Sequence, residues 1–135
     1  MLAVFIGVVL SLLIIFSAKF SRFDRDISFY PSILIFIAIF YILFAVMAGH
    51  SIVREISIAL VFITLALYGA YKSLFIVGLA IALHGAYDIL HILKFKETVA
   101  PIWWAPFCAA VDFVVGVWVM YLFKIRGLQV KPHAN

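Results

Sequence analysis

The sequence contains few charged residues. Of its 135 residues, ten are Lys or Arg and six are Asp or Glu, so 12% are charged. Soluble globular chains carry about twice that proportion, and a water-soluble fold is therefore excluded. The mean hydropathy of +1.27 is spread along the whole chain, which also excludes a soluble domain held by a single membrane anchor.

Cysteine and long polar segments are also scarce. Cys108 is the only cysteine, so an intramolecular disulfide is excluded. It lies in an apolar run and is expected to be a packing residue. None of the polar breaks is long enough for a second domain, and we expect residues 1–135 to form a single integral membrane domain.

What the sequence has instead is apolar runs, because 68% of its residues are hydrophobic. A membrane-spanning helix needs roughly 17 to 25 mainly apolar residues. Five such spans are predicted, at residues 2–18, 30–49, 56–71, 73–93 and 102–123. The expected fold is an all-α membrane protein, a bundle of about five transmembrane helices, whose third and fourth spans form a hairpin at Lys72.

The basic residues divide unequally between the two ends of this predicted bundle. One end collects seven of them, Lys19, Arg22, Arg25, Lys72, Lys124, Arg126 and Lys131, and the other collects Arg54, Lys94 and Lys96. Cytoplasmic loops carry the excess of Lys and Arg, so the C-terminus is predicted in the cytoplasm and the N-terminus outside. Because these residues lie in short connections and in the tail, their expected partner is the anionic lipid surface and not nucleic acid.

Titratable residues mark the last two spans. His84, Asp88 and His91 stand at i, i+4 and i+7, so they share one face of the fourth helix. Asp112 stands alone in the apolar fifth span. With a rise of about 1.5 Å per residue, His84 and Asp112 each lie roughly 14 to 15 Å from the predicted outer interface. The two side chains should therefore be level in the membrane.

The cost of an ionisable side chain at this depth, about 2.5 to 3.5 kcal/mol, makes a lipid-facing position unfavourable. These groups should face one another, a ligand or water. His50 and Glu55, in or beside the turn between the second and third spans, are expected to open the cluster to the outside, and with Tyr87 they form a possible additional polar site. Glu55 and its neighbour Arg54 are predicted to form a solvated ion pair.

Three interpretations of the cluster remain open. In the first, His84, Asp88, His91 and Asp112 bind a divalent metal, zinc or iron, and a metal-bound water acts on a lipid-like or apolar small molecule. His84 and His91 are about 10.5 Å apart along the helix axis, so they need not share an ion, and Asp88 with either histidine is the safer pair.

In the second interpretation the same residues serve a proton- or cation-coupled transporter or channel subunit, because His titrates near neutral pH. In the third, the protein is a non-catalytic accessory subunit, with Asp112 accepting a hydrogen bond from His84 and Asp88 accepting one from His91. A homo-oligomer or a larger membrane complex is compatible with each of the three.

The last two spans also carry a family resemblance. The run His84-Gly-Ala-Tyr-Asp88-Ile-Leu-His91, followed by Cys108-Ala-Ala-Val-Asp112, resembles an uncharacterised family of small five-span bacterial membrane proteins. That resemblance implies the five-span fold and a location in the bacterial inner membrane, and it brings no activity with it. In that family a Trp is usual where this chain has Tyr87, and a second His follows His91 where this chain has Ile92.

Overall fold

The structure, a computed structural model, describes residues 1–94 and 99–126, and it is helical over most of them. The elements are α1 (Leu2–Ser21), the short 3-10 helix η1 (Phe23–Arg25), α2 (Phe29–Ala48), α3 (Ile52–Lys72), α4 (Leu74–Lys94) and α5 (Trp104–Arg126). All five α-helices are long and apolar enough to cross a membrane. The predicted all-α membrane fold is confirmed.

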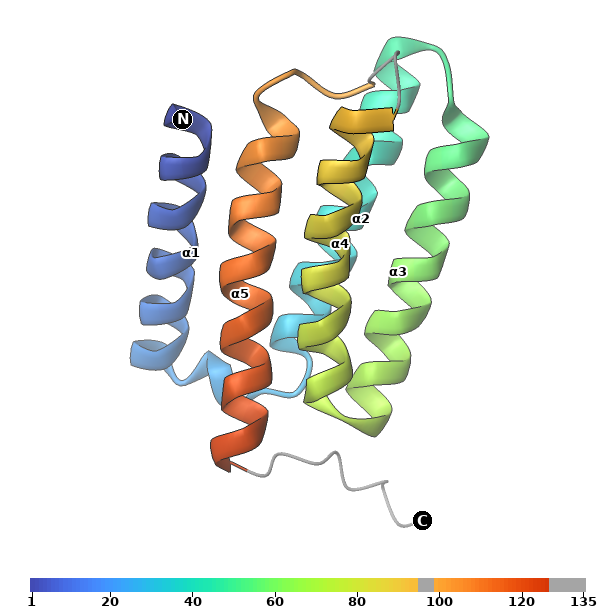
Figure 1. Ribbon diagram of the computed structural model, residues 1–135. Helices are drawn as coiled ribbons and strands as arrows, with labels where there is room; N and C mark the ends of the chain where they lie inside the picture. The colour runs from blue at the N-terminus through green and yellow to red at the C-terminus, as the bar shows by residue number, and fades with distance from the viewer. Residues whose placement is uncertain (95–98, 127–135) are drawn as a thin grey trace.

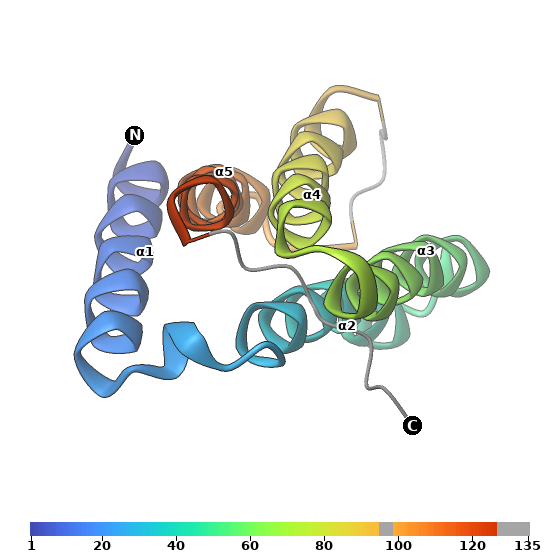
Figure 2. The same cartoon turned by 90° about the horizontal axis from the view of Figure 1, so that it is seen from below.

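The helices alternate in direction, so the chain connections fall at two ends (Figure 1). Met1 and the α2–α3 turn lie at one end, which we call the predicted outer end. η1 and the α3–α4 turn lie at the other. Viewed along the bundle, α5 stands between α1 and α4, and α4 also packs against α2 and α3 (Figure 2). The helix that carries His84, Asp88 and His91 is thus the central one.

Some helices extend beyond the predicted spans. α1 continues to Ser21, where Arg22 takes a left-handed conformation with φ 62° and ends the helix. α3 begins at Ile52, four residues before the predicted apolar run. The reason is that Glu55 in its first turn is buried in the bundle, so a polar residue that breaks the apolar pattern belongs to the helix.

Glycines allow α4 and α5 to approach until their backbones touch. A Cβ atom on Gly78 would lie 2.8 Å from the carbonyl oxygen of Gly116, and a Cβ on Gly116 would lie 2.8 Å from that of Gly78. Small residues serve this purpose in membrane helices, where dispersion contacts replace the hydrophobic effect. Asp112 stands one turn before Gly116 on α5, and a Cβ on Gly85 of α4 would lie 3.0 Å from Cβ of Asp112. This close packing brings Asp112 against the polar face of α4.

Buried contacts also lie near each end of the bundle. At the predicted outer end, Val99 and Ala100 are buried against Tyr41 and Ala45. At the opposite end, Arg126 of α5 pairs with the buried Asp24 of η1 at 2.7 Å. The orientation across the membrane stays a prediction, and two of the residues on which it rests, Lys96 and Lys131, lie outside the described residues.

Candidate metal centre

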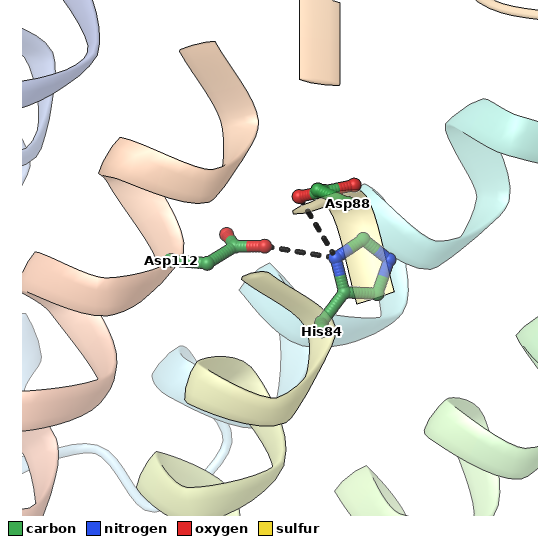
Figure 3. A group of neighbouring side chains, drawn as sticks. All are labelled: His84, Asp88 and Asp112. Carbon is green, nitrogen blue, oxygen red and sulfur yellow. Dashed lines mark hydrogen bonds and ion pairs between the residues drawn. The ribbon is translucent and has the colours of Figure 1, made fainter. Parts of the chain in front are cut away.

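His84 and Asp112 meet in the middle of the bundle, one from α4 and one from α5. Nδ1 of His84 lies 2.8 Å from Oδ2 of Asp112 (Figure 3). Both residues are at most 1% exposed. The two side chains lie at the same height along the bundle axis, as the helical rise counted from the outer ends of the two spans predicts. A hydrogen bond between this pair was also part of the accessory-subunit interpretation.

Asp88 joins this pair from the next turn of α4. Its Oδ2 lies 3.7 Å from Nδ1 of His84, so the imidazole nitrogen faces both carboxyl groups (Figure 3). Its Oδ1 accepts a hydrogen bond of 2.7 Å from the hydroxyl of Tyr41 on α2. The accessory-subunit interpretation paired Asp88 with His91, but Asp88 accepts its hydrogen bond from Tyr41 and Nε2 of His91 faces Glu55.

Tyr41 is a site residue that the sequence analysis missed. It is 2% exposed and lies near the middle of the α2 sequence. Tyrosines of membrane helices are enriched at the interfaces, so a tyrosine at the centre of an apolar span was the signal that a polar partner stands opposite. Its partner comes from 47 residues away in the sequence, which no local pattern could indicate.

The three polar residues do not balance in charge or in hydrogen bonds. Two buried carboxyl groups face a single imidazole. Among the described residues, Oδ2 of Asp88 and Oδ1 of Asp112 have no hydrogen-bond partner. A buried polar atom without a partner costs about 1–3 kcal/mol, and more if it is charged. The arrangement is therefore suited to a positively charged occupant, either a metal ion or a proton.

The three side chains are close enough to bind one metal ion if they rearrange. One potential ligand atom from each of His84, Asp88 and Asp112 lies within 4.8 Å of the other two. In a tetrahedral site with bonds of about 2.0 to 2.2 Å, two ligand atoms stand about 3.3 to 3.6 Å apart. The widest of the three separations would therefore have to contract by roughly 1 Å to bring all three atoms onto one ion. These three residues could hold a metal.

His91, the fourth predicted ligand, lies in a different cluster. Its Nε2 is 3.5 Å from Oε1 of Glu55. The other oxygen of Glu55 accepts a hydrogen bond of 2.8 Å from the hydroxyl of Tyr87. Nε of Arg54 donates to Oε1 of Glu55, also at 2.8 Å. We call Arg54, Glu55, Tyr87 and His91 the outer cluster.

Two expectations about this region need correction. The Arg54–Glu55 ion pair exists, but it is not solvated, because the Glu55 side chain is 0% exposed and only Arg54, at 30%, contacts solvent. The first turn of α3 faces α4, and this buries the carboxylate. Glu55 and Tyr87 do come together as predicted, whereas Nδ1 of His50 lies 3.1 Å from the hydroxyl oxygen of its neighbour Ser51.

Aromatic rings fill the space between the metal-site residues and the outer cluster. The Tyr41 ring lies 5.0 Å from the ring of His91 and 5.6 Å from that of Tyr87. Phe62 of α3 packs edge-on against His84 at 4.8 Å. Tyr41 is thus in contact with both groups of polar residues, through its hydroxyl on one side and its ring on the other.

The fold and these contacts define a five-helix membrane protein with a buried His/Asp cluster between its two most closely packed helices. Residues 1–125 match the model of a family of unknown function (DUF6010), and the chain belongs to this family. The resemblance to an uncharacterised family is thereby confirmed, and the match extends well beyond the last two spans. Comparison with curated proteins and with solved structures gave no match.

Proposed function

We propose that this protein binds a first-row divalent cation, zinc or iron, through His84, Asp88 and Asp112. One observation carries the proposal: two buried carboxyl groups face the imidazole of His84, and each has one oxygen that accepts no hydrogen bond among the described residues. A divalent ion would bind those oxygens and offset both negative charges. One nitrogen and two carboxylate oxygens are ordinary ligands for zinc and for non-haem iron.

Three protein ligands leave a coordination position for water. A metal ion lowers the pKa of such a water far enough to make it a nucleophile at neutral pH. The hydroxyl of Tyr41 holds the carboxyl group of Asp88, and partners of this kind fix the orientation of a ligand. The arrangement supports an enzymatic role in which a metal-bound water is activated within the membrane.

An apolar cavity beside the cluster supports a lipid-like or apolar substrate. It has a volume of about 590 Å³ and lies between α1, α2 and α5. Its lining includes Cys108 and Val111, and Cys108 stands one helical turn before Asp112 on the same face of α5. A hydrocarbon chain in this cavity would lie one turn of helix from the proposed metal ligands.

Elemental analysis of the protein purified in mild detergent tests the proposal. The wild-type chain should retain about one zinc or iron ion, and Asp112→Asn, which keeps the size of the side chain and removes its charge, should lose it. His84→Ala should lose it as well. Asp26→Asn removes the same charge from an exposed connection and should leave the metal content unchanged. A wild-type protein that neither retains nor takes up a metal would contradict the proposal.

Proton- or cation-coupled transport is the second candidate. A proton shared by Asp88 and Asp112 would also satisfy the two carboxylate oxygens that lack a partner. The observation that favours this alternative is the series of polar residues from the outer cluster to Asp112. Proton flux in liposomes that depends on pH and is lost in Asp112→Asn, in protein free of bound metal, would support transport over metal binding.

Tyr41→Phe removes the hydroxyl that donates to Asp88 and changes nothing else. We expect the affinity for Zn²⁺ to fall about 10- to 100-fold, the usual effect of losing a group that orients a metal ligand, with the stoichiometry unchanged. Isothermal titration calorimetry measures both quantities. Tyr68→Phe, on the exposed face of α3, is the matched control. Equal affinities for the two variants would mean that Tyr41 does not position Asp88.

A further inference from the structure

The proposed metal ligands are far from water. His84 lies ten residues before the end of α4, about 15 Å along the helix axis. His84, Asp88 and Asp112 are each at most 1% exposed. A divalent ion loses its hydration in hydrocarbon, so it needs polar groups along its path to this depth.

The outer cluster lies on the direct path from the predicted outer end. Glu55 stands in the first turn of α3 and His91 in the last turn of α4. His91 and Asp88 are three residues apart on one face of α4, about 4.5 Å along the axis. A ligand atom of the deeper group therefore lies about one helical turn beyond the imidazole of His91.

In the outer cluster, the positive charge of Arg54 opposes the negative charge of Glu55. Nε and Nη2 of Arg54 both lie 2.8 Å from Oε1 of Glu55. That guanidinium offsets the negative charge of Glu55 and would repel a cation. Arg54, at 30%, and Tyr87 are the partly exposed members of the cluster, whereas Glu55 and His91 are buried. A movement of the Arg54 side chain toward solvent would remove the charge that opposes Glu55.

We propose that Glu55 and His91 form a transient binding station through which a divalent cation reaches His84, Asp88 and Asp112, and that Arg54 closes this station until the ion displaces it. This role depends on the proposed metal-binding function and adds the route by which the ion reaches its site. Glu55 supplies the attraction, His91 supplies a neutral nitrogen ligand, and Tyr41 and Tyr87 line the step to Asp88. Neither Glu55 nor His91 is a ligand in the final site.

The test measures how fast Zn²⁺ enters the full-length protein in detergent. Stopped-flow mixing with a fluorescent zinc indicator gives the rate constants for uptake and release, and calorimetry gives the equilibrium Kd. Glu55→Gln removes the attracting charge and should slow uptake by about tenfold or more, the lower end of electrostatic effects on association. Arg54→Gln removes the repelling charge and should accelerate uptake. In both variants release should change by the same factor, so Kd and stoichiometry should stay within about twofold of wild type.

Lys72→Gln is the matched control, because it removes one positive charge at the opposite end of the bundle and should change neither rate. Uptake that is unaltered in both Glu55→Gln and Arg54→Gln, or altered in the same direction in both, would overturn the station. A change in Kd with an unaltered uptake rate would also overturn it, since Glu55 would then position the final site. A wild-type protein that binds no Zn²⁺ would instead refute the proposed function, which separates the two failures.

Discussion

Gly116→Val is expected to force α4 and α5 apart and to lower the free energy of unfolding by about 3 kcal/mol, the upper end of the range for overpacked cores. The added Cβ would meet the backbone nitrogen of Ala82 and the carbonyl oxygen of Gly78, each at 2.8 Å. Backbone atoms of a packed helix cannot rotate away as a side chain can. Because Asp112 stands one turn before Gly116, its contact with His84 should be lost as well, and with it the bound metal.

Unfolding in mixed detergent micelles containing increasing dodecyl sulfate measures this loss of stability, and elemental analysis measures the metal. Val117→Phe is the control for added volume on the same helix, because Val117 is 58% exposed and faces away from the interface. That variant should be close to wild type in both measurements. If Gly116→Val were as stable as Val117→Phe, the close contact between α4 and α5 would not be what holds the site together.

His84→Leu is expected to destabilise the metal-free protein by about 1–3 kcal/mol, the usual effect of leaving a buried hydrogen-bonding group without its partner. The substitution places an apolar side chain of similar size in the bundle but removes the one imidazole, among the described residues, that faces both Asp88 and Asp112. Asp88 would keep the hydrogen bond from Tyr41, whereas Asp112 would lose its partner. The same unfolding measurement, made in the presence of a chelator, separates this effect from the loss of metal.

The double variant His84→Leu/Asp112→Leu provides the comparison. Replacing both members of a buried polar pair with apolar residues is often neutral, so the double variant should be more stable than His84→Leu alone. This recovery would show that the pairing, and not the loss of the imidazole shape, determines the effect. A double variant less stable than either single variant would mean that the site's contribution to folding does not come from the pair.

The helices themselves could be predicted because their formation depends on the composition of each segment alone. A run of about twenty apolar residues must satisfy its own backbone hydrogen bonds in hydrocarbon, and a helix does so within the segment. Five runs therefore predict five helices without knowledge of how they pack. The start of α3 was predicted too late for the same reason: a rule based on apolar runs stops at Glu55, whose buried position depends on Tyr87 and His91 of another helix.

The site was predictable only where periodicity and depth could be counted. The spacing of His84, Asp88 and His91 places them on one face of α4, and the helical rise sets His84 level with Asp112. Depth alone does not give the direction in which a side chain points around the bundle, so the sequence could not show that Asp88 turns to Tyr41. The four predicted ligands were named together, although their spacing already indicated that His84 and His91 need not share an ion, and three of the four lie together.

By itself the sequence determined that this protein is a membrane-spanning helical bundle and that its titratable residues must be enclosed, because both follow from the cost of exposing polar groups to hydrocarbon. Only the tertiary structure decided which of those residues meet. That choice depends on the rotation of each helix about its own axis, and the rotation is set by contacts such as Gly78 against Gly116. Contacts between residues far apart in the sequence leave no periodic signal along the chain, so the division into an inner His/Asp group and an outer cluster appears only after the helices have packed.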